Sequence, residues 1–107
     1  MKNKNFFPAI SVIIVNYNGK RFLKRCLASL SGINYPKNKI EVILVDNCSS
    51  DGSISYIRKY FRKVKLIENS DNNYCRANNK AINLSKGEYI AFLNNDTKVH
   101  KNWLIEM

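Results

Sequence analysis

The feature that most constrains this fold is a fourfold alternation of short apolar runs and amphipathic segments along 107 residues. The apolar runs are rich in β-branched or aromatic residues and end at polar residues, which is typical of buried strands. The amphipathic segments carry apolar residues at helical spacing, which predicts one buried stripe on each helix. We expect strands at residues 11–15, 40–45, 64–67 and 88–93, and helices at residues 20–31, 53–61, 75–84 and 100–107.

Strands that alternate with helices of this length predict βαβ units and an α/β fold. The expected architecture is a three-layer α/β/α sandwich with a mainly parallel sheet, because right-handed crossovers place helices on both faces. We take the strand order to be 3-2-1-4 and residues 1–107 to form a single domain. The apolar sides of the helices are expected to comprise Phe22, Leu23, Cys26, Leu27, Leu30, Ile54, Ile57, Phe61, Ala77, Ala81, Ile82, Trp103 and Leu104.

Polar residues follow three of the expected strands at their carboxyl ends. The sequence Asn16-Tyr17-Asn18 follows the first strand, Asp46 the second and Asn94-Asn95-Asp96 the fourth. In the strand order 3-2-1-4 the direction of the order reverses between strands 1 and 4, and ligands of open α/β sheets bind at such a reversal. The sequence therefore predicts one shared site at this edge of the sheet.

The residue types at these strand ends suit a phosphorylated nucleotide. Tyr17 offers a flat ring on which a base can stack, and Asp46 offers an acceptor for donors on a base or ribose. Asp96 is a hard oxygen ligand of the kind that Mg²⁺ and Mn²⁺ prefer, and Asn95 adds a polar group. Simpler explanations stay open, since Asp46 and Asp96 can also cap a turn or a helix and Tyr17 can pack at the rim.

The composition favours anionic partners, because the formal net charge is +10. Five basic residues lie within residues 58–65 without an acidic neighbour, and they form either a solvated helix face or a surface attracted to an anionic membrane. Nucleic acid is not expected as a partner, because no RNA- or DNA-binding motif is present.

The three cysteines, Cys26, Cys48 and Cys75, have no metal-binding spacing and are expected to be free thiols in the cytoplasm, with the inner face of the membrane as a possible location. The absence of GxGxxG and of GxxxxGK[ST] argues against a classical dinucleotide-binding fold and a P-loop NTPase. Neutral Asn16 and Asn18 argue against a phosphorelay receiver, which needs acids after its first strand.

Four segments in order resemble the motifs of family 2 glycosyltransferases of the GT-A fold. They cover nearly the whole chain, and together they are far more specific than any one of them. The second resembles the nucleotide-base motif and the fourth resembles the strand and loop that carry the metal-binding DxD. The segments are residues 11–19 (SVIIVNYNG), 42–53 (VILVDNCSSDGS), 72–82 (NNYCRANNKAI) and 87–97 (GEYIAFLNNDT).

This resemblance implies the N-terminal, nucleotide-sugar-binding half of a truncated GT-A domain. It implies transfer of a sugar from a UDP-, dTDP- or GDP-type donor to a saccharide or lipid-linked acceptor, with Mn²⁺ or Mg²⁺ as cofactor. A half domain is also expected to expose an apolar edge and so to form a homo-oligomer. The variants around residues 46–53 and 93–97 look most similar to a rhamnosyltransferase-like branch. Asp96 would hold the metal, and the nucleotide-sugar would contact Val15, Asn16, Tyr17, Asp46, Asn79, Asn94 and Asn95.

The chain departs from the family pattern at several positions. Asn94 stands where the DxD motif has its first aspartate, and Asn78 stands where an arginine is usual, with Arg76 nearby as an alternative phosphate ligand. No acid matches the family's catalytic base, which is expected beyond Met107, and His100 is a weak substitute. The alternative function is therefore a non-catalytic module that binds a nucleotide-sugar or acts by association.

Overall fold

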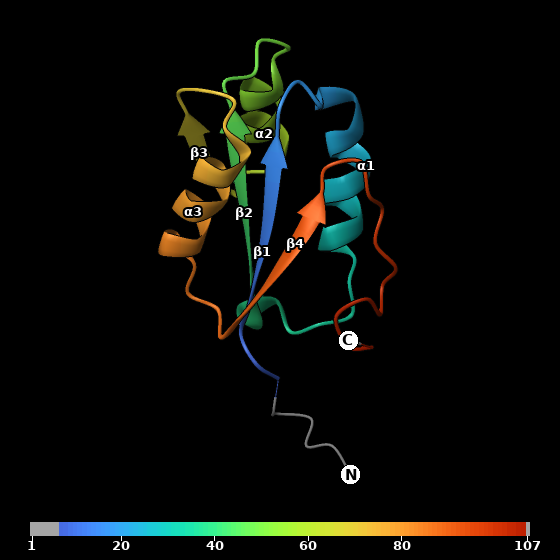
Figure 1. Ribbon diagram of the computed structural model, residues 1–107. Coiled ribbons are helices and arrows are strands. Elements are labelled where there is room, and N and C mark those ends of the chain that lie inside the picture. The colour runs from blue at the N-terminus through green and yellow to red at the C-terminus, as the bar shows by residue number, and fades with distance from the viewer. Residues whose placement is uncertain (1–6, 107) are drawn as a thin grey trace.

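The computed structural model describes residues 7–106 and contains one four-stranded parallel sheet in the order β3-β2-β1-β4 (Figure 1). This order and the parallel pairing confirm the predicted sheet. The elements are β1 (Ile10–Asn16), α1 (Lys20–Ser31), the short 3₁₀ helix η1 (Lys37–Lys39), β2 (Ile40–Asn47), α2 (Ser53–Tyr60), β3 (Lys65–Asn69), α3 (Tyr74–Leu84) and β4 (Tyr89–Asn94).

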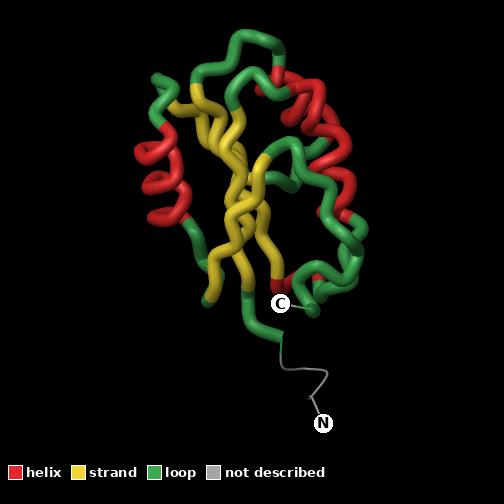
Figure 2. The backbone as a smooth tube through the Cα atoms, turned by 45° about the vertical axis from the view of Figure 1, so that its right-hand side comes forward, coloured by secondary structure: helices red, strands yellow, loops and turns green. Residues whose placement is uncertain are grey.

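Helices cover both faces of the sheet, which gives the expected three layers. Figure 2 shows α3 on one side of the strands and the remaining helices on the other. The side chains of β1 alternate accordingly, since Val12 and Ile14 pack with α1 and α2 while Ile13 packs with α3. Because β1 is buried on both faces, its residues 12–15 are continuously apolar rather than alternating.

The two helical faces are built from side chains of different size. Leu23, Cys26, Leu27 and Leu30 of α1 fill the larger core, in agreement with the predicted stripe. On the other face α3 contributes the buried residues Ala77 and Ala81, whose small side chains bring the helix close to β1 and β2. The helix α3 therefore lies close to the sheet on one face, and α1 and α2 enclose a larger core on the other face.

Three sequence predictions about the helices were wrong. Phe22, expected on the apolar side of α1, is 37% exposed, because it lies about 100° around the helix from the buried Leu23. Ile82 is 39% exposed, because it lies about 100° around α3 from Ala81 and so faces away from the sheet. Residues 101–106 form turns instead of a helix, although Leu104 is buried and Trp103 is half-buried. The carbonyl of Lys101 accepts a hydrogen bond from the amide of Asn34 at 2.5 Å, which competes with the helical bond that this carbonyl would otherwise accept. Residue 107 lies outside the described part of the chain.

The strands are slightly longer than predicted at the carboxyl edge. β2 continues to Asn47 and β3 to Asn69, where the two residues are register partners. The Nδ2 of Asn69 donates to Oδ1 of Asn47 at 3.0 Å. Polar residues therefore lengthen the β2–β3 pairing beyond the apolar runs from which the strand ends were predicted. Among the described helices the longest, α1, has 12 residues, and none is long and apolar enough to cross a bilayer.

The opposite, amino edge of the sheet is held together by Glu41 of β2. Its carboxylate accepts hydrogen bonds from Ser11 Oγ of β1, from the backbone amide of Lys86 before β4 and from Lys65 Nζ of β3, each at 2.5 Å. One side chain thus connects all four strands or their leading loops. Ser11 Oγ in turn accepts the amide of Gly87 at 2.8 Å, which fixes the entry into β4.

We predict that Gly87→Ala lowers the free energy of unfolding by about 1–3 kcal/mol, measured by urea denaturation. A Cβ at Gly87 would lie 2.5 Å from the amide nitrogen of Ser11 and 2.8 Å from the carbonyl carbon of Ile10. These are backbone atoms, so the strand itself would have to move. Gly32→Ala is the matched control, because its Cβ would meet no atom closer than 3.8 Å. Equal stabilities of the two variants would contradict the close approach at Gly87.

We further predict that Glu41 makes stability sensitive to acid. Burial alone would raise the pKa of Glu41, but the hydrogen bonds from Lys65, Ser11 and Lys86 outweigh it and lower that pKa from 4.5 to about 2. Because the folded pKa lies below the ordinary value, the contribution is complete above about pH 4.5 and is lost as the pH falls toward 2.

The measurement is the free energy of unfolding as a function of pH for the wild type and Glu41→Gln. The wild type should lose its advantage over the variant across that acidic range. A difference between the two proteins that stays constant from neutral pH to pH 2 would show that the carboxylate charge of Glu41 does not support the fold.

Candidate functional site

Three strand ends meet at the carboxyl edge of the sheet, as their polar sequences predict. Asn16 is the register partner of Asp46, and Val15 is the partner of Asn94. In Figure 1 the arrowheads of β1, β2 and β4 point to the same edge. The loops that follow these strands are therefore neighbours in space, and they form the candidate site.

Asn16 links the three strand ends through its side chain. Its Nδ2 donates to Oδ1 of Asp46 at 2.9 Å, and its Oδ1 accepts from Nδ2 of Asn95 at 2.8 Å. Asn16 and Asp46 are both 0% exposed. Buried polar groups need such partners, because each unsatisfied group costs about 1–3 kcal/mol. The link fixes the loop after β4 relative to β1 and β2.

The carboxylate of Asp46 is engaged by the chain on both oxygens. Oδ1 accepts from Asn16, and Oδ2 accepts from the amide of Ser49 at 2.9 Å. The second bond closes an Asx-type turn after β2, at which Cys48 adopts a positive φ of 64°. The turn-capping role that the sequence left open is thus present in the structure, and contact between Asp46 and a nucleotide base stays a prediction.

The loops after β1 and β2 are joined by hydrogen bonds that the sequence analysis missed. The amide of Asn18 donates to Ser49 Oγ at 2.8 Å, and Asn18 Oδ1 accepts the amide of Ser50 at 2.8 Å. Gly19, in the loop after β1, packs against the Asn16–Asn95 hydrogen bond, where a Cβ would clash with Asn95 Nδ2 and lie 2.6 Å from Asn16 Oδ1. The only signal in the sequence was the richness of both loops in Asn, Ser and Gly, which favour such turns.

Asp51 holds the beginning of α1. Its Oδ2 accepts the amide of Lys20, the first residue of the helix, at 2.9 Å, and its Oδ1 accepts the amide of Ser53 at 3.0 Å. Burial alone would raise the pKa of Asp51, but these hydrogen bonds and one from the Ser53 hydroxyl lower it. The carboxylate is therefore kept charged beside the positive end of α1, where a negative charge is favourable.

A second set of polar side chains extends the edge toward β3 and α3. Asn47 and Asn69 are buried and hydrogen-bonded, Asn47 also donates to Asn72 Oδ1 at 3.3 Å, and Lys80 Nζ donates to Asn69 Oδ1 at 2.5 Å. Arg76 forms an ion pair with Asp71, so the guanidinium suggested as a phosphate ligand is engaged at the start of α3. Asn79 lies exposed on α3.

Other predicted residues remain open to solvent. Tyr17 is 50% exposed, and Asn94 and Asp96 are exposed, whereas Asn95 and Val15 are half-buried. The edge thus combines a rigid, buried hydrogen-bonded layer with an accessible ring, amide and carboxylate. These accessible groups are the ones that a ligand can reach without disturbing the layer beneath.

Cys26 lies beneath the loop after β4 and belongs to the core. Burial, with the negative charge of Asp96 as a smaller cause, raises the pKa of the Cys26 thiol to about 11. Its Sγ approaches the carbonyl oxygen of Asn94 at 3.8 Å. A thiol that stays protonated and buried is a poor nucleophile, so Cys26 is a packing residue.

The residues present fit a divalent cation held jointly with a ligand. Within residues 7–106 no group of three or more His, Cys, Asp or Glu side chains is placed to hold a metal ion by itself. Asp96 is an exposed carboxylate two residues after the exposed amide of Asn94. Mg²⁺ is commonly bound by one or two carboxylates together with substrate phosphates and water, and Asp96 can supply the protein's share of that arrangement.

Comparison with known proteins identifies the family. Residues 11–107 match the sequence profile described as glycosyl transferase family 2. The chain belongs to glycosyltransferase family 2. The predicted family is confirmed, and the strand order together with the structural relatives below confirms the predicted GT-A type of fold. The rhamnosyltransferase-like branch and the individual site residues stay predictions.

The family 2 chain resembles larger proteins over part of their length. It is 37% identical over 101 residues to glycosyltransferase AglE of Haloferax volcanii, with 91% of this chain and 33% of AglE covered. It is 31% identical over 98 residues to the poly(ribitol-phosphate) β-N-acetylglucosaminyltransferase TarS of Staphylococcus aureus, with 88% of this chain and 17% of TarS covered. The chain therefore spans about a third or less of these relatives.

Solved structures show the same arrangement. The crystal structure of S. aureus TarS 1–349 in complex with UDP-GlcNAc matches with a TM-score of 0.84 and 29% identity, covering 92% of this chain and 29% of that one. The mannosyltransferase PcManGT from Pyrobaculum calidifontis, in complex with GDP-Man and Mn²⁺, matches with a TM-score of 0.85 and 25% identity, covering 91% and 30%.

We predict that Asn16→Ala destabilises the family 2 chain by about 2–3 kcal/mol, measured by urea denaturation. The substitution removes the partners of Asp46 and Asn95 at once and leaves a buried carboxylate with one fewer donor. Asn72→Ala is the control, because Asn72 is exposed and makes a single long side-chain bond to Asn47. A loss of stability no larger than that of the control would show that the buried link is unimportant.

Proposed function

We propose that this chain forms the donor-binding part of a glycosyltransferase that transfers a sugar from a nucleotide-diphosphate-sugar to a saccharide or lipid-linked acceptor. The observation that carries the proposal is the carboxyl edge of the sheet. There the Asn95–Asn16–Asp46 link, in which Asn16 and Asp46 are buried, supports the exposed ring of Tyr17 and the exposed carboxylate of Asp96. A nucleotide with a diphosphate needs these two kinds of group at the two ends of one site.

Each site residue has a proposed role. The ring of Tyr17 stacks on the base, and Asn94, Asn95 and Asn79 offer amide groups to the sugar and phosphates. Val15, Asn16 and Asp46 form the base of the nucleotide-sugar site. The buried carboxylate of Asp46 holds the turn after β2, against which the nucleotide base lies. A divalent cation bound at Asp96 would neutralise the diphosphate and stabilise it as a leaving group.

A non-catalytic, nucleotide-sugar-binding module is the second candidate. The observation that favours it is the engagement of nearby acids, since Asp46, Asp51 and Asp71 all accept hydrogen bonds from the chain itself. A general base must be free to accept a proton from the acceptor hydroxyl, and these engaged carboxylates are not. For the first candidate, a catalytic transferase, we propose that the base lies outside the 107 residues. Sugar transfer by the 107-residue chain alone would exclude the second candidate.

The finer assignments rest on sequence variants and on relatives. We propose rhamnosyl transfer from a dTDP-type donor on the basis of residues 46–53 and 93–97, with UDP and GDP donors as the alternatives that the TarS and PcManGT complexes suggest. We propose Mn²⁺ or Mg²⁺ as the cation, because hard oxygen ligands suit both. Competition between dTDP, UDP and GDP for the same site would rank these donors.

Self-association through β4 is a further part of the proposed function. β4 is an edge strand with exposed Tyr89, Ile90 and Phe92, the last 53% exposed. An apolar edge strand is a ready surface for a further strand or a second copy. Light scattering across a concentration series would reveal oligomers, and a strict monomer at high concentration would contradict self-association.

We predict that nucleoside diphosphates bind more tightly in the presence of Mn²⁺ and that Asp96→Ala removes most of this metal-dependent gain. Loss of a charged ligand from a partly exposed site should weaken Mn²⁺-dependent binding about tenfold or more, measured by titration calorimetry. Binding without metal should change little.

The matched variant is Asn94→Asp, which adds a second carboxylate to the same loop and should strengthen the Mn²⁺-dependent part. Because Asp96 and Asn94 are exposed, neither substitution should alter folding. A wild-type protein that binds no nucleoside diphosphate at millimolar concentration would refute the proposed function.

A further inference from the structure

The outward face of α1 carries a dense group of positive charge around a shallow hollow. The hollow has a volume of about 540 Å³, and its described lining contains four basic residues and no acidic one. We call it the α1 groove. It is lined by Arg21, Lys24, Arg25, Ala28, Ser29 and Lys98.

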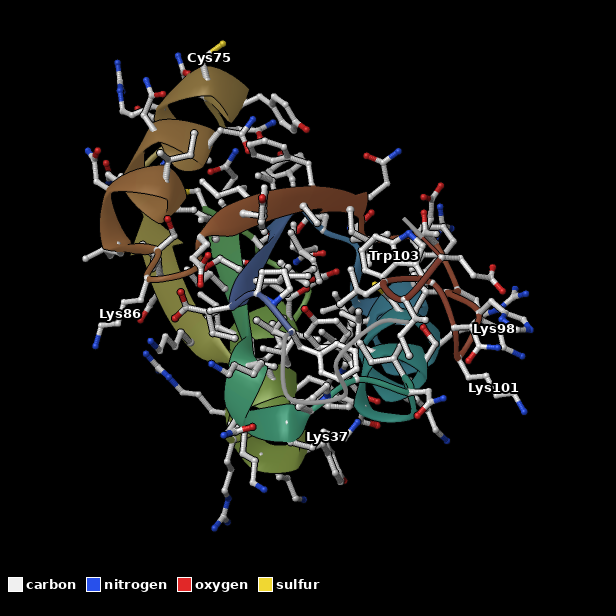
Figure 3. All side chains as sticks on the ribbon, turned by 90° about the horizontal axis from the view of Figure 1, so that it is seen from below. Lys37, Cys75, Lys86, Lys98, Lys101 and Trp103 are labelled. Atoms are coloured by element: carbon white, nitrogen blue, oxygen red, sulfur yellow. The ribbon has the colours of Figure 1, made fainter. Side chains whose placement is uncertain are left out.

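Two segments that are far apart in the sequence build the α1 groove. The amide of Val99 donates to Ser29 Oγ at 3.0 Å, and Val99 is buried, so the segment after β4 is fastened alongside α1. Figure 1 shows this segment, in red, running beside α1. Figure 3 shows Lys98 and Lys101 projecting outward on one side of the molecule. The fastening brings Lys98 to the basic side chains of the helix.

The charges of the α1 groove are not neutralised by the described part of the chain. The ion pairs within residues 7–106 join Arg58 to Glu68, Lys65 to Glu41 and Arg76 to Asp71. None of them involves a residue of the α1 groove. Residues 58–65, which the sequence suggested as a lipid-attracting surface, therefore have two of their five basic residues paired. The structure points to α1 as the stronger anion-attracting surface.

We propose that the α1 groove docks the protein on an anionic bilayer, with lipid phosphate headgroups as its partners. The hollow is shallow, and the hydroxyl of Ser29 is already used, since it donates to the carbonyl of Cys26 at 2.7 Å and accepts from Val99. The groove thus lacks a buried donor that would fix one small anion. A surface with many phosphates satisfies several long basic side chains at once.

An exposed aromatic ring beside the groove supports the same partner. The guanidinium of Arg21 lies over the ring of Phe22 at 4.7 Å, and Phe22 is 37% exposed. An aromatic ring next to cations can enter the headgroup region while the cations bind phosphate. This surface runs along the outer side of α1, and its Arg21 end adjoins Asn18 and Asp51 of the loops at the carboxyl edge.

The test is sedimentation with phosphatidylcholine vesicles that contain or lack phosphatidylglycerol. A basic residue near an anionic surface raises partitioning about fivefold, so the triple variant Arg21→Gln, Arg25→Gln, Lys98→Gln should bind anionic vesicles about 100-fold more weakly. The control, Lys59→Gln, Arg62→Gln, Lys63→Gln, removes the same charge from the α2–β3 surface and should lose less than about fivefold. Binding should also weaken as salt rises.

Several outcomes would overturn the proposal. Equal losses in the two triple variants would assign binding to net charge alone, and failure of the wild type to bind anionic vesicles at low salt would exclude membrane docking. Calorimetry with soluble tripolyphosphate forms a second arm, in which tight binding without vesicle binding would assign the groove to a soluble polyanion. If the groove variant has a lower urea midpoint, the single change Arg25→Gln replaces it, with an expected loss of about fivefold.

Discussion

The candidate site depends on one buried amide, that of Asn16. An amide donates and accepts at the same time, so this side chain can join the carboxylate of Asp46 to the amide of Asn95. An apolar residue at this position would leave both partners unsatisfied, and an aspartate would place two carboxylates in contact. The choice of asparagine therefore sets the geometry of three strand ends without adding a buried charge.

The apolar pattern was sufficient to predict the sheet. Continuous apolar runs identified four strands, and their alternation with helices predicted parallel pairing through crossover connections. The order 3-2-1-4 was taken from the usual doubly wound arrangement, and the structure has this order. The pattern was insufficient where a competing hydrogen bond decides the backbone. Residues 101–106 have helical spacing but form turns, and the amide of Asn34 donates a hydrogen bond to the carbonyl of Lys101. Ile82 shows a further limit, since helical periodicity gives a stripe but not its width.

The polar layer of the site was only partly predictable. Tyr17, Asp46 and Asp96 were identified because parallel strand ends must share an edge. The bonds between Asn18 and Ser49, and between Asn47 and Asn69, depend on how two loops or strand ends face each other across 31 and 22 residues of sequence. Residue type alone does not encode such facing, because Asn and Ser satisfy many turn geometries equally well. The complete burial of Asp46, which is 0% exposed, was likewise not predictable from sequence patterns.

The cysteines divide into one inert thiol and two accessible ones, which has a practical consequence. Cys26 is buried with a raised pKa, whereas Cys48 and Cys75 are exposed. Cys48 stands in the turn after β2 and Cys75 in the first turn of α3, where Figure 3 shows it at the periphery of the molecule. A thiol-reactive fluorophore would therefore label the turn after β2 and the first turn of α3 and would not react with the buried Cys26. The protein carries its own attachment points for optical reporters of what happens at that edge.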